Sequence, residues 1–512
     1  MARGARIVAW VAALCLALSA CSVGEGVDLA GAGEIDTDDY LKVAIAGQPD
    51  QLDPHQTSAY FSFQILENVY DTLVQPDENL VMQPALAESW EVSDDQLSWT
   101  FHLREGVEFH DGSPFTAEDV VYSYNRIIDE QLANAYRLSS VEDVVAVDDH
   151  TVRIDLSQPT PALLAAIGGY KGMAIVDQEN VESGDAQLYP IGTGPFEVVG
   201  NVASQAVTLR ANEDYWGTGP YVPGIVFRFI SEGTTALADL TAGEIHWTDS
   251  IPPQRVKSLR ANPDIEVASV PSTDYWYLTM NQARPPFDSR DARLAVAWAI
   301  DRQAIADVTW YGNATVNQTA VPETPVWHHP YSPFERDVER ARELAEQSGL
   351  AGETVGLMVT NEYPETVTAA QVIAANLADI GVETDIRVLD FATWLAEQAE
   401  GNFDMLLLGW LGNIDINDYY YNQHHSEGAN NVQGYSNPEV DRLLEAGRTE
   451  TDPEVRKELY ARAAELIVDD ASYVYLYNPN VVQAWTEELH GYEARPDRAV
   501  RFNDVWLEED TE

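Results

Sequence analysis

Two separate stretches of the chain alternate between strand and helix patterns, and this alternation limits the possible fold more than any other feature. In the first stretch, residues 225–230 are an apolar run typical of a strand, residues 234–241 have a short helical pattern, and residues 244–248 form a second strand-like run. Strands that alternate with helices are joined by crossovers and pair in parallel. The stretch therefore predicts one α/β lobe.

The second stretch runs from residue 354 to residue 410. Between Val382 and Val388, every second residue is apolar or a threonine and the residues between them are charged, which is the period of a strand with one buried face. Gly381 stands where the preceding helix should stop, since glycine readily adopts the left-handed conformation that ends helices. The expected elements are strands at 354–360, 382–388 and 403–410 and helices at 363–379 and 391–400. They predict a second α/β lobe.

Two segments are predicted to connect the lobes. The aromatic segment from Asp274 to Gln282 is interpreted as a strand that crosses from the first lobe to the second. Residues 484–506 resume strand-like patterning after a predicted helix at 453–468, and we interpret them as the return crossing. Two crossings make a hinge. The boundaries that follow are lobe 1 at 40–275 and 486–512, with a subdomain at about 70–190, and lobe 2 at 276–485.

The first residues of the chain have the parts of a bacterial export signal. Arg3 and Arg6 precede an uncharged run, residues 7–20, which ends in small residues next to Cys21. The run is too short for a transmembrane helix, which needs roughly 20 apolar residues. A buried N-terminal helix is the alternative.

Cleavage of this signal would leave Cys21 as the first residue of the mature chain. We expect residues 1–20 to be a signal peptide, Cys21 to carry a lipid anchor, and residues 21–39 to form a flexible tether, because they are rich in small and acidic residues and lack periodicity. The other cysteine, Cys15, would leave with the signal. No disulfide is then expected within one mature chain.

Charge and motifs exclude several classes of function. The 84 acidic residues outnumber the 29 basic ones and give a net charge of −55, which repels nucleic acid, so no nucleic-acid partner is expected. The sequence lacks a nucleophile elbow, a phosphate loop, paired zinc-ligand cysteines and an HExxH motif, so we expect no catalytic residues, no enzyme activity and no cofactor.

The histidine pairs at 328–329 and 424–425 are weak metal candidates, because adjacent residues of a strand point to opposite faces and no further ligand is suitably spaced. No metal site is predicted.

Three runs near the start of the mature chain follow one another closely. They are Ala85–Trp90 (ALAESW), Trp99–Val107 (WTFHLREGV) and Phe109–Val120 (FHDGSPFTAEDV). With these runs, the chain resembles the family 5 solute-binding proteins of ABC transporters, which include dipeptide-, oligopeptide- and nickel-binding members. The segments at 192–196, 214–216, 284–287 and 299–302 are similar to later landmarks of the family, so the resemblance covers nearly the whole mature chain.

The resemblance implies a two-lobed, periplasmic-binding-protein-like α/β fold with an extra subdomain in lobe 1. It implies that a small ligand is enclosed when the lobes close, and that the membrane subunits of an ABC permease receive it. Together with a lipid on Cys21, the resemblance implies that the protein is located outside the cell membrane and is anchored to it.

The best candidate pocket follows the strand that ends at Trp410, because ligands on open parallel sheets lie beyond the carboxyl ends of strands. Trp410 can stack on a ligand, while Asp415 and Asp418 can bind an amine or cation; the alternative is that these acids only build turns. Peptide-binding members of the family commonly carry an aspartate three residues after the tryptophan, where this chain has Asn413. Asp415 is a candidate replacement.

Two further candidates for ligand contact come from other segments. Tyr60 lies in the polar and aromatic stretch 56–63, which resembles a pocket-lining segment of the family, and Trp276 lies on the aromatic crossing strand. Both can equally be packing residues. The sequence thus predicts a substrate-binding lipoprotein of an ABC importer that captures a peptide or similar small solute. A binder of oligosaccharides or other organic solutes, and a binder of nickel or another metal complex, are the alternatives.

Overall fold

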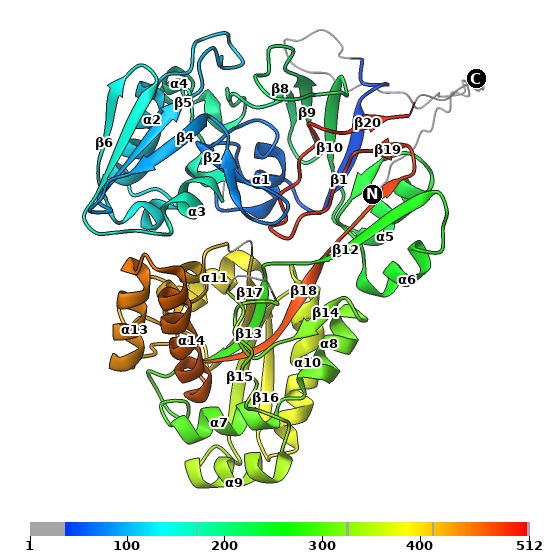
Figure 1. Ribbon diagram of the computed structural model, residues 1–512. Coiled ribbons are helices and arrows are strands. Elements are labelled where there is room, and N and C mark those ends of the chain that lie inside the picture. Colours follow the sequence, from blue (N-terminus) through cyan, green and yellow to red (C-terminus); the bar gives the residue numbers. More distant parts are fainter. Residues whose placement is uncertain (1–35, 170, 324–326, 412–413, 509–512) are drawn as a thin grey trace, which may run out of the picture. The chain divides into compact units, whose positions relative to one another are not determined.

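The computed structural model describes residues 36–169, 171–323, 327–411 and 414–508 (Figure 1). The export signal, Cys21, nearly all of the tether and Asn413 lie outside these ranges. No helix within them is long and apolar enough to cross a membrane.

Lobe 1 is the part of the chain built around strand β1. Its strands are β1 (Leu41–Ile45), β8 (Phe196–Val202), β9 (Ala206–Ala211), β10 (Gly224–Phe229), β11 (Trp247–Thr248) and β12 (Ile265–Pro271), with the pair β19 (Leu489–His490) and β20 (Trp506–Leu507). Its helices are α1 (Tyr60–Leu66), α4 (Gln178–Ser183), α5 (Gly233–Thr241) and α6 (Val256–Leu259). Strands β10 and β11 both pair in parallel with β1, one on each side of it. The first predicted βαβ unit is therefore confirmed, with β1 inserted between its two strands.

A second sheet of lobe 1 has its own core. It has the order β4-β5-β7-β6 and is antiparallel throughout. Its elements and the short pieces beside it are β2 (Val74–Pro76), β3 (Met82–Pro84), β4 (Ala87–Val92), β5 (Ser98–Leu103), α2 (Ala117–Asp129), η1 (Ala135–Leu138), β6 (Val141–Asp148), β7 (Thr151–Leu156) and α3 (Leu163–Gly168). Helix α2 begins with a capping box, in which the backbone N–H of Thr116 donates to Oδ2 of Asp119 at 2.8 Å.

Lobe 2 is the α/β body that contains strands β13–β17. Its strands are β13 (Tyr275–Met280), β14 (Ala314–Val316), β15 (Thr354–Thr360), β16 (Glu383–Leu389) and β17 (Met405–Trp410). Its helices are α7 (Arg290–Ala299), α8 (Arg302–Trp310), α9 (Val338–Ser348), α10 (Pro364–Ala378), α11 (Phe391–Ala399), α12 (Ile416–His424), α13 (Pro438–Thr449) and α14 (Pro453–Asp469). Strand β15 pairs in parallel with β16 and β17, which confirms the second predicted α/β unit.

The edge position of β16 corrects one detail of the predicted pattern. The strand lies at the end of the sheet, and the side chain of Val388 is 49% exposed although the alternation placed it on a buried face. Val382, just before the strand, is buried. An edge strand is covered by fewer neighbours, so periodicity overstates its burial.

One long strand joins the two lobes. Strand β18 (Tyr473–Thr486) pairs with β13 and β14 through its first half and with β12 and β11 through its second half. The outward crossing is the step from β12 to β13, close to the predicted segment. The return crossing is β18 and not residues 484–506, most of which have no regular structure. Its continuous apolar and aromatic run, from Tyr473 to Leu476, is what a strand buried on both faces requires.

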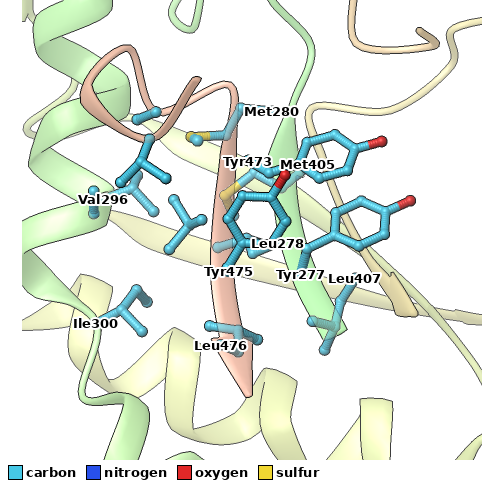
Figure 2. Packing of buried hydrophobic residues seen from close by; sticks show 14 of the residues in the cluster. Tyr277, Leu278, Met280, Val296, Ile300, Met405, Leu407, Tyr473, Tyr475 and Leu476 are labelled. Carbon is cyan, nitrogen blue, oxygen red and sulfur yellow. The ribbon is translucent and has the colours of Figure 1, made fainter. Parts of the chain in front are cut away.

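The core of lobe 2 is built on the aromatic strands themselves. Figure 2 shows side chains of β13, β17 and β18 packed with those of α7. The rings of Tyr277 and Tyr473, on paired strands, stack at 3.9 Å between centroids and 3° between planes. Each such fully buried aromatic side chain stabilises the fold by roughly 1.5–3 kcal/mol. The crossing strands are therefore held firmly where they enter lobe 2.

Candidate functional site

Residues from both lobes gather where parallel strands end. We call this group the strand-end site, and its members are Tyr60, Gln64 and Asp249 from lobe 1, Arg498 and Asp274 beside the crossing, and Trp276, Tyr363 and Glu365 from lobe 2. Helix α1 follows β1, and Asp249 directly follows β11, so neighbouring parallel strands deliver the lobe 1 members to one edge of the sheet. Such an edge is where open α/β sheets bind ligands.

Asp249 is the centre of the lobe 1 group. Its Oδ2 atom accepts a hydrogen bond from Nε2 of Gln64 at 2.8 Å and a longer one from the hydroxyl of Tyr60 at 3.4 Å. Burial raises the pKa of Asp249 above that of an ordinary aspartate, and the bond from Gln64 opposes this rise. The carboxyl group is thus held in place within a partly desolvated pocket.

Arg498 brings a positive charge to the same place. Its Nε atom pairs with the fully buried carboxylate of Asp274, the residue directly before β13, and its guanidinium carbon lies 5.9 Å from the centre of the Tyr60 ring. The charge of Arg498 lowers the pKa values of both Asp249 and Glu365, against the larger effect of burial. Arg498 therefore stands between the lobe 1 and lobe 2 members of the site.

The lobe 2 side of the site is aromatic. Trp276 is 3% exposed, and its ring meets Tyr363 edge-on at 5.8 Å and stacks on Tyr477 at 6.4 Å. Trp410, at the end of the neighbouring strand β17, is only partly buried. Trp276 and Tyr363 form an aromatic floor on one face of the β13–β17 ladder, whereas Trp410 pairs with Tyr275 and lies on the opposite face.

Glu365 lies in the first turn of α10, beside this aromatic floor. Burial raises its pKa to about 7, well above the ordinary glutamate value. The group therefore changes charge near neutral pH.

Asp415 belongs to a buried ion pair, which the sequence did not predict. Its two carboxylate oxygens accept hydrogen bonds from Nη1 and Nη2 of Arg456 at 2.7 and 2.6 Å, and one of them also caps helix α12. Both side chains of this ion pair are buried. Bidentate pairing with arginine engages both carboxylate oxygens, so Asp415 holds Arg456 and the start of α12 in place.

Asp418 bridges the two lobes. Its Oδ2 atom lies 3.5 Å from Nη1 of Arg137, which belongs to η1 in the subdomain sheet region of lobe 1. The cavity beside this pair has a volume of about 50 Å³ and is lined by both residues together with Asn417 and Arg448. That volume suits a water molecule or two and not a peptide.

The histidine pairs have structural partners. His424 is fully buried, its ring nitrogens bond to the hydroxyls of Ser472 and Tyr475, and burial lowers its pKa to about 3. His329 bonds to a carboxylate oxygen of Glu465 at 3.2 Å. Among the described residues, no group of three or more His, Cys, Asp or Glu side chains is placed to hold a metal ion.

Comparison with known proteins decides the family. The family model "Bacterial extracellular solute-binding proteins, family 5 Middle" matches residues 81–431. The chain belongs to family 5 of the bacterial extracellular solute-binding proteins. This confirms the predicted resemblance and the two-lobed α/β fold.

Individual relatives are similar over almost their whole length. The glutathione-binding protein GsiB of Salmonella typhimurium is 28% identical over 481 residues, which are 91% of this chain and 94% of GsiB. The periplasmic binding protein DppA of Helicobacter pylori, solved with the peptide STSA, has a TM-score of 0.83 at 28% identity over 92% of this chain and 98% of that one. MoaA of A. tumefaciens R10, solved with mannopinic acid, has a TM-score of 0.83 at 26% identity over 92% and 100%.

Family 5 membership fixes the general activity. The protein is a solute-binding protein of an ABC importer, it binds a small solute, and it is not an enzyme.

Of the predicted site residues, the structure brings Tyr60 and Trp276 to the strand-end site. It places Trp410 at the end of β17 opposite Tyr275, on the other face of the ladder from Trp276, and Asp418 at the bridge between the lobes. Gln64, Asp249, Asp274 and Arg498 were not predicted from the sequence as site residues. Asp249 follows the second strand of a predicted βαβ unit, so the strand-end rule could have found it. Arg498 lies in an irregular segment whose pattern carries no such signal.

Proposed function

We propose that this family 5 protein is a lipid-anchored binding protein that captures a short peptide or a related amino-acid-derived solute at the strand-end site. The single observation that carries the proposal is the meeting of opposite charges at that site. Tyr60 lies between the two charges, because its hydroxyl is 3.4 Å from Oδ2 of Asp249 and its ring centre is 5.9 Å from the guanidinium carbon of Arg498. A solute with both an ammonium and a carboxylate group complements such a pair.

The similar proteins support the same class of solute. One relative is named for binding glutathione, and a structure of another holds a tetrapeptide. Both ligands are peptides with charged ends. The aromatic floor of Trp276 and Tyr363 would pack against the rest of the solute.

Capture would follow from closure of the lobes about the two crossings. A solute that contacts both lobes binds the closed form better than the open form, and it shifts the population toward the closed form. That form would then dock on the permease. No covalent step is needed.

Isothermal titration of the signal-free protein, residues 22–512, tests the solute class. The titrants are an equimolar pool of dipeptides to tetrapeptides, glutathione, a pool of oligosaccharides, and nickel ions. We expect saturable heat with the peptide pool or glutathione. Saturable binding of an oligosaccharide or of nickel, with no heat from any peptide, would contradict the proposal.

The anchor is tested separately in the full-length chain. A Cys21→Ser variant removes the thiol that would carry the lipid, so the protein should move from the membrane fraction to the soluble exported fraction. A variant that stays in the membrane fraction would contradict lipid attachment at Cys21. A Cys15→Ser variant is the matched control and should stay anchored.

A further inference from the structure

Two buried acceptor oxygens at the strand-end site lack a hydrogen-bond donor among the described residues. They are Oδ1 of Asp249 and Oε1 of Gln64. Gln64 is 1% exposed, and its Nε2 atom is used by the bond to Oδ2 of Asp249, so its carbonyl oxygen stays beside that carboxyl group. A buried acceptor without a donor lowers the stability of the fold by about 1–3 kcal/mol. A donor group that reached both oxygens would therefore be bound favourably.

Charge defines the kind of donor that fits. Asp249, Asp274 and Glu365 are three acidic groups beside the single positive charge of Arg498, so the site has an excess of acidic groups. Arg498 is already paired with Asp274 through its Nε atom, and within the described residues no hydrogen bond joins its other nitrogens to Asp249. Tyr60 does not reach Oδ1 of Asp249, because its hydroxyl is directed to the other carboxylate oxygen, Oδ2. A group with several hydrogen-bond donors and a positive charge fits these two oxygens.

Carboxylates of lobe 2 near Trp410 are already engaged. Asp415 is held by Arg456 in a bidentate pair, and Asp418 lies beside Arg137. Neither arrangement presents an acceptor pair like that of Asp249 and Gln64.

We infer that Asp249 and Gln64 bind the ammonium group of the solute, so that the amine anchor of this protein lies in lobe 1 and not in the lobe 2 loop after Trp410. This inference rests on the proposed function, in which the solute is a peptide or a related amine. An ammonium group has three donors and no acceptor. It can satisfy Oδ1 of Asp249 and Oε1 of Gln64 together, and its positive charge complements the excess of acidic groups.

The test compares Asp249→Asn and Gln64→Met with the unchanged protein. Both replacements are close in size to the original side chains. Asp249→Asn removes the negative charge of the first acceptor, and Gln64→Met removes the second acceptor oxygen, Oε1. The probes are the peptide Ser-Thr-Ser-Ala and the tightest member of the peptide pool, each with a free and with an acetylated amino terminus. Asp264→Asn is the control, because Asp264 is an exposed aspartate of lobe 1 outside the site. Urea unfolding of each variant checks that it is folded.

The unchanged protein should bind the free-amine form of a probe at least about tenfold more tightly than the acetylated form, because charge-assisted bonds are lost on acetylation. Asp249→Asn should weaken binding of the free-amine form by about tenfold or more and should remove most of this discrimination. Gln64→Met should act in the same direction with a smaller effect, and Asp264→Asn should change neither.

Two results would overturn the inference, and they are distinguishable. If the unchanged protein binds peptides but folded Asp249→Asn and Gln64→Met variants keep the same affinity and the same preference for a free amine, the anchor is elsewhere and the proposed function stands. If the unchanged protein binds no peptide at all, the proposed function fails and the inference fails with it.

Discussion

The indole ring of Trp276 lies directly over Gly409, its partner across the β13–β17 ladder. A Cβ atom at Gly409 would stand 2.8 Å from Cε2 of Trp276 and 3.0 Å from the backbone oxygen of Tyr275. Glycine at position 409 therefore allows the Trp276 ring to pack closely against strand β17, next to Trp410.

Gly409→Ala should consequently destabilise the fold and weaken solute binding. Overpacking a tight core contact of this kind costs about 1–3 kcal/mol, because Trp276 must shift against Tyr363 and Tyr477. Urea unfolding and titration with the peptide pool measure the two effects. Gly356→Ala in the same sheet is the control, since a Cβ there meets a movable oxygen of Asp404 at 3.3 Å. Equal stability and affinity in the two variants would contradict the packing argument.

Asp415→Asn should lower stability much more than affinity. The substitution leaves the buried charge of Arg456 without its partner, which costs about 3–5 kcal/mol in the free energy of unfolding. The affinity of the folded protein for peptide should change by less than about threefold. Urea unfolding and calorimetry check both values. Unchanged stability with a large loss of affinity would make Asp415 a ligand residue after all.

The double variant Asp415→Leu with Arg456→Met should recover part of the lost stability, because both charges are gone.

The ion pair of Arg137 and Asp418 should favour the solute-bound state. It joins the lobes, so it is complete only when they are together, and removing either charge should weaken peptide binding. A double-mutant cycle with Arg137→Ala and Asp418→Ala should give a coupling of about 1 kcal/mol that shrinks in high salt. Arg210→Ala breaks a pair with Glu197 inside lobe 1 and should not affect affinity. Additive effects of the two substitutions would show that the pair does not contribute to closure.

Glu365 should make the protein less stable as the pH rises from about 4.5 to about 7. Burial raises its pKa from 4.5 to about 7, so the folded state holds a proton that the unfolded state has lost between these two values. Stability from this group is therefore full below about pH 4.5, falls by about 1–3 kcal/mol between pH 4.5 and 7, and changes no further above that range. Glu365→Gln should flatten that fall, measured as unfolding free energy at pH 5 and pH 8. Glu339→Gln, an exposed acid in the first turn of α9, should leave it unchanged.

Local patterns predicted the elements of this fold well. Strand β15 spans Thr354–Thr360 as its apolar run indicated, and helix α14 ends one residue beyond the predicted limit. Burial periodicity and helix capping depend on a few neighbouring residues, so both can be recognised in a single sequence. The return crossing was misplaced because β18 is buried on both faces, and a strand of that kind has no alternation to mark it.

The site was harder to predict because its contacts join distant residues. Arg498 pairs with Asp274 and Arg456 with Asp415, across 224 and 41 positions of the chain. With 84 acidic residues in the sequence, charge alone does not select the partner of an arginine. Tyr60 was a candidate because its segment resembles the family, and Trp276 and Trp410 because they lie on or at the end of predicted strands, whereas the acceptor pair of Asp249 and Gln64 depends on tertiary geometry.

A crystal structure of residues 22–512 grown with the tightest peptide of the pool tests the central claim most directly. The claim predicts that the solute lies at the strand-end site, with its ammonium group within hydrogen-bond distance of Asp249 Oδ1 and its chain against Trp276 and Tyr363. A peptide bound instead in the 430 Å³ cavity beside His110 and Tyr189, or one whose ammonium group meets only Asp418, would contradict it.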